Sequence, residues 1–193
     1  MPESPPKPNE PTPATMGSRI RWDALAAIIA ALIGLLALCV SGYTAYIQRQ
    51  QVRAQVWPYL GWEYSSVFHH YTWTNEGVGP AIVKSVQVLV DGKPQQDWKS
   101  VRHTLQIPPF PFNQSTLNRE VLSPGQTLKW IVFKQETDYE NFSRAVDQAK
   151  VEFKVCYCST LGDCWTLRSG GKTPNATIET RRCPSPSAIS FQQ

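Results

Sequence analysis

One uninterrupted apolar segment limits the possible folds of this chain more than any other feature. From Ala24 to Ile47 the sequence contains no charged residue. As an α-helix rising about 1.5 Å per residue, the segment would span about 36 Å, against roughly 30 Å for the hydrocarbon core of a bilayer. We therefore expect it to cross a membrane as a single helix, with the lipid bilayer as its partner.

The flanks of this segment favour a retained anchor over a cleaved signal peptide. Trp22 on one side and Tyr43 and Tyr46 on the other occupy positions typical of interfacial aromatic rings. The apolar core exceeds the roughly 7–15 residues of a signal peptide, and the small-residue pattern of a cleavage site is absent. Arginines occur on both sides, so charge bias alone does not set the orientation.

The sequence changes character three times and so divides into four parts. Residues 1–18 are rich in proline and poor in large apolar side chains, which predicts a disordered tail. Residues 19–56 are expected to form the transmembrane helix and a juxtamembrane stalk, which ends before Pro58 because the residue preceding a proline disfavours helix. Residues 57–183 form the folded domain, and residues 184–193 form a flexible tail.

Cysteine usage indicates an oxidising compartment. Cys39 lies in the apolar segment, and the other cysteines are concentrated towards the carboxyl end at Cys156, Cys158, Cys164 and Cys183. An even number of cysteines in a small domain is typical of proteins exposed to oxidising conditions. The amino-terminal tail would then be cytoplasmic and the domain extracytoplasmic.

The local pattern narrows the three connectivities that four cysteines allow. Apolar and polar residues alternate from Val151 to Cys158, which predicts a strand with Cys156 and Cys158 on one face. Residues 164–167 are predicted to return as the second strand of a hairpin, with Cys164 opposite Cys158. We therefore prefer the disulfides Cys158–Cys164 and Cys156–Cys183. The alternatives are unpaired structural thiols and a zinc or copper site. C-x-C spacing fits a metal site poorly, and no metal or other cofactor is expected.

Other segments with strand periodicity precede this hairpin. The longest ends at Asp91-Gly92, a strong signal for a tight turn, and the last follows a Ser-Pro-Gly turn. The segments are Tyr59–Tyr64, Phe68–Thr74, Ala81–Val90 and Thr127–Phe133.

One short helix interrupts the strands. Thr137 and Glu140 have the spacing of a capping box, and apolar residues from Tyr139 to Ala149 recur at helical intervals. The strand count, the turn spacing and a domain length of about 130 residues favour one fold class. It is mainly β, an antiparallel immunoglobulin-like β-sandwich with one short helix, preceded by a single N-terminal transmembrane helix.

The segment Asn75–Ala81, NEGVGPA, predicts a bulged crossover between strands. Its glycines allow positive φ angles or close backbone approach, and Pro80 cannot donate to a β-ladder. A phosphate-binding loop would need a following helix with free amides, whereas a valine-rich strand follows here. We therefore assign the segment a structural role.

Several motifs together resemble one group of proteins. They are VWPYL, NEGVGPA, DGKP and VCYCS followed by CW, at Val56–Leu60, Asn75–Ala81, Asp91–Pro94, Val155–Ser159 and Cys164–Trp165. In these motifs the chain is similar to uncharacterised single-pass membrane proteins of Gram-negative bacteria, from the anchor to Leu167. The resemblance implies an inner-membrane anchor with a periplasmic sandwich, and it implies no activity.

No residue pattern indicates a catalytic site. His69 and His70 are adjacent on an expected strand and would point to opposite faces, so they cannot jointly bind one metal. The sequence has no G-x-S-x-G elbow or comparable nucleophile motif. We therefore expect no enzyme and no catalytic residues. The net charge of +4 comes from scattered basic residues, which gives no basis for nucleic-acid binding.

Two features are candidates for binding. The loop around Phe110 and Phe112 is apolar and rigid with proline, so its rings could form an exposed anchor for a partner, or alternatively plug the end of the core. Ala26, Ala30 and Gly34 form a face of small residues on the anchor. Such a face permits close approach of a second helix and hence a homodimer.

These features favour a non-catalytic, membrane-anchored extracytoplasmic module that binds or helps assemble another envelope protein. The alternative is a small-molecule or ion sensor with a pocket in the β-sandwich, around Trp62, Tyr71, Trp73 and Trp130. The expected location is the bacterial inner membrane, single-pass, with the N-terminus cytoplasmic and the C-terminal domain periplasmic.

Overall fold

The computed structural model describes residues 19–170, 173–184 and 190–192, and the predicted disordered tail, residues 1–18, lies outside them. The chain divides into two compact units, Met1–Gln50 and Gln51–Gln193. The described part of the first unit is helical, and the second unit contains all of the described strands.

Helix α1 spans Arg19–Gln55 and includes the whole apolar segment. Among the described residues it is the one helix long and apolar enough to cross a membrane. Its side chains from Trp22 to Val52 are exposed, and an exposed helical surface that is apolar on all sides is suited to lipid. As expected, the helix continues past Ile47 and ends before Pro58.

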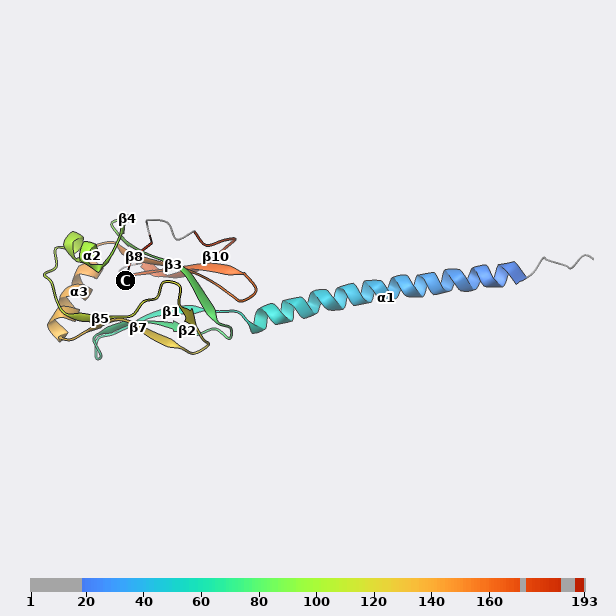
Figure 1. The fold of residues 1–193 in the computed structure, drawn as a ribbon, viewed down its shortest axis with the longest axis horizontal. Coiled ribbons are helices and arrows are strands. Elements are labelled where there is room, and N and C mark those ends of the chain that lie inside the picture. Colours follow the sequence, from blue (N-terminus) through green and yellow to red (C-terminus); the bar gives the residue numbers. More distant parts are fainter. Residues whose placement is uncertain (1–18, 171–172, 185–189, 193) are drawn as a thin grey trace, which may run out of the picture. The chain divides into compact units, whose positions relative to one another are not determined.

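The described strands of the second unit form two antiparallel sheets (Figure 1). The first has the order β1-β2-β7-β5, formed by Leu60–Ser65, His70–Asn75, Thr127–Phe133 and Phe112–Gln114. The second has the order β10-β9-β8-β3-β4, formed by Thr173–Thr180, Cys164–Gly170, Val151–Cys158, Ala81–Val90 and Lys93–Gln95. The short β6, Val121–Leu122, also pairs with β3. The prediction of a mainly antiparallel β domain after a long apolar helix is confirmed.

The registers follow from the local sequence. In β8 the apolar members of the alternating pattern are buried, while Glu152 and Lys154 share the other face and form an ion pair of 3.6 Å. The turn from β3 to β4 has positive φ at both Asp91 and Gly92, 50° and 76°, which is the conformation of a type I′ turn. The predicted hairpin is therefore present.

Aromatic rings from both sheets meet in one core. Trp62 on β1 and Trp130 on β7 lie 4.8 and 5.3 Å from the ring of Phe153 on β8, so the two sheets face each other. Trp73 and Trp130 have no exposed surface. They therefore belong to the core and do not line a pocket, which corrects the expectation for these two residues.

The fully buried Asn75 fixes the crossover from the first sheet to the second. Its Nδ2 donates to the carbonyl oxygens of Gly79 and Leu122 at 2.8 and 2.9 Å. Its Oδ1 accepts from the amides of Tyr59 and Gly77 at 3.2 and 3.1 Å. Because a primary amide offers two donors and two acceptor sites, the side chain uses its full hydrogen-bonding capacity. It holds together the segment after α1, the crossover and β6.

Gly77 and Gly79 allow another backbone segment to pass close to them, which is one of the two roles expected from the sequence. A Cβ at Gly77 would collide with the backbone of Trp57 and Tyr59, and a Cβ at Gly79 with that of Val56. Neither glycine has a positive φ angle. The expected bulge lies further along, inside β3, where the pairing with β8 shifts.

The described part of the domain contains two short helices, so the expectation of one was wrong. Helix α2, Trp98–Leu105, begins with a capping box: the Ser100 amide donates to Asp97 Oδ1 at 2.7 Å, and the Asp97 amide donates to the Ser100 hydroxyl at 3.1 Å. The helix buries Trp98 and Val101. The usual box has Glu or Gln at this position, so Ser100 gave no clear signal.

Helix α3, Glu136–Gln148, lies where a helix was predicted but begins differently. Its N-cap is Gln135, whose side chain makes no capping hydrogen bond, so the expected capping box of Thr137 and Glu140 is wrong. Acidic residues in the first turn instead stabilise the positive end of the helix dipole. The apolar face is correct, with Tyr139, Phe142 and Val146 buried. Figure 1 shows α2 and α3 at the same end of the sheets.

The carboxyl end is fixed where it is described. Phe191 has no exposed surface, its ring lies 4.9 Å from that of Trp98, and its amide donates to the carbonyl oxygen of Val86 at 3.0 Å. The expected flexible tail is therefore wrong for residues 190–192, because an aromatic side chain near the end fills the core. Residues 185–189 and 193 lie outside the described part.

Candidate functional site

Two disulfides join the end of β8 to β9 and to the segment after β10. They connect Cys158 with Cys164 and Cys156 with Cys183, the connectivity that we preferred from the hairpin pattern. Cys158 and Cys164 are direct partners in the β8–β9 register, with Cα atoms 4.0 Å apart. Cys39 in α1 is the free cysteine among the described residues.

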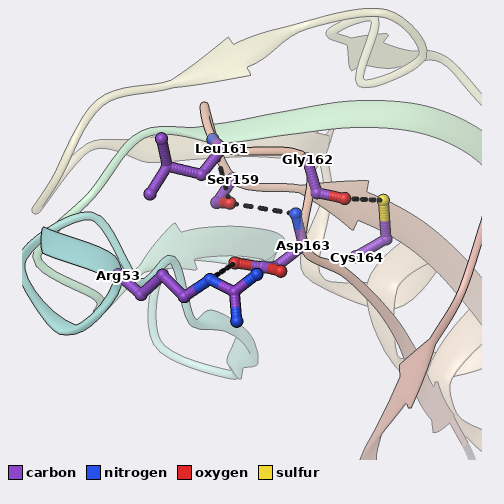
Figure 2. A network of polar contacts seen from close by, with 6 residues as sticks. All are labelled: Arg53, Ser159, Leu161, Gly162, Asp163 and Cys164. Carbon is purple, nitrogen blue, oxygen red and sulfur yellow. Dashed lines mark hydrogen bonds and ion pairs between the residues drawn. The ribbon is translucent and has the colours of Figure 1, made fainter. Parts of the chain in front are cut away.

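The hairpin loop that the first disulfide closes is held from two sides (Figure 2). The Ser159 hydroxyl accepts from the amides of Leu161 and Asp163 at 3.2 and 3.3 Å. The Asp163 carboxylate lies 3.5 Å from Nε of Arg53, in the last turn of α1. The loop therefore connects the disulfide to the segment that leads into the domain.

The two disulfides touch each other. The Sγ atoms of Cys158 and Cys183 lie 3.7 Å apart, and the sulfur atoms of these two residues and Cys164 all lie within 4.8 Å of one another. Thiolates, not disulfides, bind soft metal ions. These three residues could therefore hold zinc or copper only after reduction.

A separate hollow of about 280 Å³, the α3 hollow, is lined by residues of α3 and of both sheets. Its wall combines aromatic rings with polar groups. The rings are Trp62, Tyr64, Tyr71 and Phe153, and the polar residues are Ser143, Asp147, Ser169 and Asn175.

Ser169 is the polar group in this wall that most strongly indicates a ligand. The residue is 1% exposed, and its Oγ has no hydrogen-bond partner among the described residues. Leaving a buried hydroxyl unpaired costs about 1–3 kcal/mol. A polar ligand atom that reaches Ser169 through the α3 hollow would recover this loss.

Burial controls the ionisation of the tyrosines beside α3. Desolvation raises the pKa of Tyr71 well above its ordinary value of 10, although a hydrogen bond with Ser143 lowers it. Desolvation also raises the pKa of Tyr139. Both hydroxyls therefore stay protonated at neutral pH and can donate hydrogen bonds. Among the described residues that line the α3 hollow, Asp147 is the one fixed charge.

The family model described as "Domain of unknown function (DUF8453)" matches residues 21–180. The chain belongs to this family. The match runs from the first turn of α1 to the last residue of β10. It therefore includes the apolar helix, the two strands joined by the Cys158–Cys164 disulfide, and the residues that line the α3 hollow. No curated protein and no solved structure matches the chain. The resemblance to membrane proteins of Gram-negative bacteria stays a prediction.

Only part of the pocket expected from the sequence exists in this DUF8453 protein. Trp62 and Tyr71 line the α3 hollow, whereas the other two expected residues are core. Ser143 and Asp147 were missed as a pair, although their i, i+4 spacing places them on one helix face. Ser169 gave no signal, because the strand pattern of the sequence weakens after Leu167.

Phe110 and Phe112 do not form an exposed anchor on this DUF8453 domain. Phe110 is 9% exposed and its ring lies 5.3 Å from that of Phe133, while Phe112 is partly buried. The Arg102 guanidinium of α2 lies 5.5 and 5.9 Å from the two rings, a cation–π arrangement. The structure therefore corrects the partner-binding expectation in favour of its alternative, a plug at the end of the core.

Ala26, Ala30 and Gly34 lie on the exposed surface of α1. Nothing lies within 4 Å of the position that a Cβ on Gly34 would take. The surface is thus open to a second helix. Its use for homodimerisation by DUF8453 proteins stays a prediction.

Proposed function

We propose that this DUF8453 protein is a non-catalytic binding module, anchored in the bacterial inner membrane with its domain in the periplasm. The apolar helix α1 supports the anchor. The two disulfides support an oxidising compartment for the domain. The two facing antiparallel sheets support an immunoglobulin-like sandwich as its finer fold class.

The binding site of this module is the α3 hollow. The observation that carries the proposal is the buried and unpartnered Ser169 hydroxyl in its wall, which an incoming polar group would satisfy. The small-molecule alternative of the sequence analysis is therefore better supported than a protein partner docking on the Phe110 loop. The Phe110 ring of that loop is packed into the core.

The wall chemistry favours a small organic cation as the ligand. The Asp147 carboxylate lines the hollow together with the rings of Trp62, Tyr64 and Tyr71, and none of the described ion pairs involves Asp147. Aromatic faces attract ammonium groups, and a neighbouring carboxylate adds to that attraction. A hydroxyl on the same ligand would pair with Ser169.

Thermal unfolding of the full-length protein in detergent micelles tests this proposal. Choline is the probe, and dimethylbutanol, in which carbon replaces the nitrogen, is its neutral counterpart. We expect choline to raise the Tm of the protein and dimethylbutanol to leave it unchanged. Asp147→Asn and Ser169→Ala should each reduce the rise, whereas Glu120→Gln, an exposed control outside the hollow, should keep it. Equal shifts with both compounds, or a full shift in Asp147→Asn, would contradict the site.

An envelope protein partner is the second candidate, because the tip of the β1–β2 hairpin is apolar and exposed. Tyr64, Val67 and Phe68 are 68%, 77% and 69% exposed. A cluster of exposed large apolar residues is typical of a docking surface. A photo-crosslinking residue at position 68 should give one discrete adduct in intact cells, and Val67→Ser should weaken it. A diffuse set of adducts would count against this candidate.

A further inference from the structure

A second hollow, of about 480 Å³, reaches both disulfides, and we name it the cysteine hollow. Cys158, Cys164 and Cys183 line it. The described residues in its wall include cations but no carboxylate, and these cations are Lys84, Arg119 and Arg182. Its volume falls within the range of small-molecule sites. Two buried cysteines and the half-buried Cys183 thus meet a cavity with positive fixed charge.

The arrangement of the sulfur atoms allows the two disulfides to exchange. The Sγ atoms of Cys158 and Cys183 belong to different disulfides and are in van der Waals contact at 3.7 Å. Exchange requires a thiolate beside a disulfide sulfur, and neighbouring cations favour the thiolate form. If Cys158 became a thiolate, its target on Cys183 would already be in contact with it.

We propose that the cysteine hollow is a thiol–disulfide exchange site for an anionic low-molecular-weight thiol. The positive charges of Lys84, Arg119 and Arg182 attract such a thiol and stabilise the thiolates formed during exchange. This inference does not depend on the proposed function, because the residues that line the cysteine hollow are not those that line the α3 hollow.

The exchange proceeds in two balanced steps. The thiolate of the incoming compound attacks Sγ of Cys164, a mixed disulfide forms, and the electron pair of the broken bond leaves on Cys158. The Cys158 thiolate then attacks Sγ of Cys183, which forms the Cys158–Cys183 disulfide and releases Cys156 as a thiolate. Cys156 takes up the proton that the incoming thiol lost. One thiol is consumed and one protein thiol is produced.

Disulfide mapping of full-length variants tests the contact between the two disulfides. In Cys164→Ser, with Cys39→Ser present to remove the anchor thiol, we expect both Cys156–Cys183 and Cys158–Cys183 peptides in acid-quenched digests analysed by mass spectrometry. In Cys156→Ser, we expect both Cys158–Cys164 and Cys158–Cys183. Detection of only the original disulfide in both variants, with native tryptophan fluorescence, would overturn the proposal.

A comparison of two thiols tests the selectivity. Glutathione is anionic and cysteamine is cationic. For each thiol, the rate of mixed-disulfide formation with the protein is divided by the rate of the same thiol with a small reference disulfide, which removes the difference in intrinsic reactivity. We expect the normalised rate to favour glutathione, with modification at Cys164. Arg119→Gln and Arg182→Gln should each lower the glutathione preference roughly two- to fivefold, as for surface charge pairs, whereas the distant exposed Arg144→Gln should not. Equal normalised rates for the two thiols would overturn the anionic selectivity.

Discussion

The side-chain amide of Asn75 donates a 2.8 Å hydrogen bond to the carbonyl oxygen of Gly79, across the turn that carries the chain from one sheet to the other. The same side chain also binds Leu122 in β6 and Tyr59 before β1. Three segments distant in sequence are therefore fixed by one buried residue. The NEGVGPA motif is thus explained by folding, without a ligand.

Replacing Asn75 with alanine should destabilise the domain strongly. The substitution leaves two amides and two carbonyl oxygens without their partner in a buried site, and each such loss costs about 1–3 kcal/mol before relaxation. We expect the free energy of unfolding in urea to fall by about 3–4 kcal/mol. Asn113→Ala, at an exposed position on β5, should change it by less than about 0.5 kcal/mol. Similar losses in both variants would refute the role of Asn75.

Gly79→Ala should destabilise the domain for a steric reason. The new Cβ would collide with the backbone of Val56, which is not a flexible side chain and can yield only by moving the segment before β1. We expect a loss of about 2–3 kcal/mol in the free energy of unfolding, as for overpacked sites. Gly42→Ala, where a Cβ would meet nothing within 4 Å, is the matched control. An unchanged urea midpoint for Gly79→Ala would show that Gly79 does not lie close to the backbone of Val56.

Strands with a strong local pattern could be predicted from the sequence. The bounds of β3, β7 and β8 agree with the alternating segments, because each carries β-branched or aromatic residues with a period of two. Strand β10 was missed because its sequence, TPNATIET, contains one large apolar residue and a proline. Its pairing with β9 comes from tertiary context that a local pattern does not contain.

The candidate sites could be predicted only in part. The cysteine pairing follows from register, since a hairpin places Cys158 opposite Cys164. The α3 hollow depends on how far α3 lies from β1, and its proposed ligand contact depends on the unpaired Ser169 hydroxyl. Neither is a local property of the sequence. The exposed anchor expected at Phe110 failed for a similar reason, because the core contacts of that ring come from residues distant in the chain.

Substitution of Gly34 by leucine should weaken any homodimer formed through α1. A large side chain on the small-residue face would separate two closely packed helices. We expect a lower dimer fraction in sedimentation measurements in mild detergent. Gly42→Leu is the control, because Gly42 lies about 80° around the helix from Gly34 on the side away from Ala26, and so about 160° from Ala26. A dimer fraction that falls equally in both variants, or in neither, would exclude this face as the contact.

Stability should fall at alkaline pH because of Tyr157. Desolvation raises its pKa from 10 to about 12, although the amide of Leu60 donates to its hydroxyl at 3.4 Å. Between these pH values the unfolded chain binds fewer protons than the folded one, so the free energy of unfolding declines as pH rises and is unaffected well below pH 10. From pH 9 to 11 we expect Tyr157 to account for a loss of about 1 kcal/mol, with Tyr71 adding in the same direction.

In urea titrations Tyr157→Phe should lose less stability over this range than the wild type, while Tyr43→Phe should behave like the wild type. A steeper decline in Tyr157→Phe would show that the alkaline loss has another source.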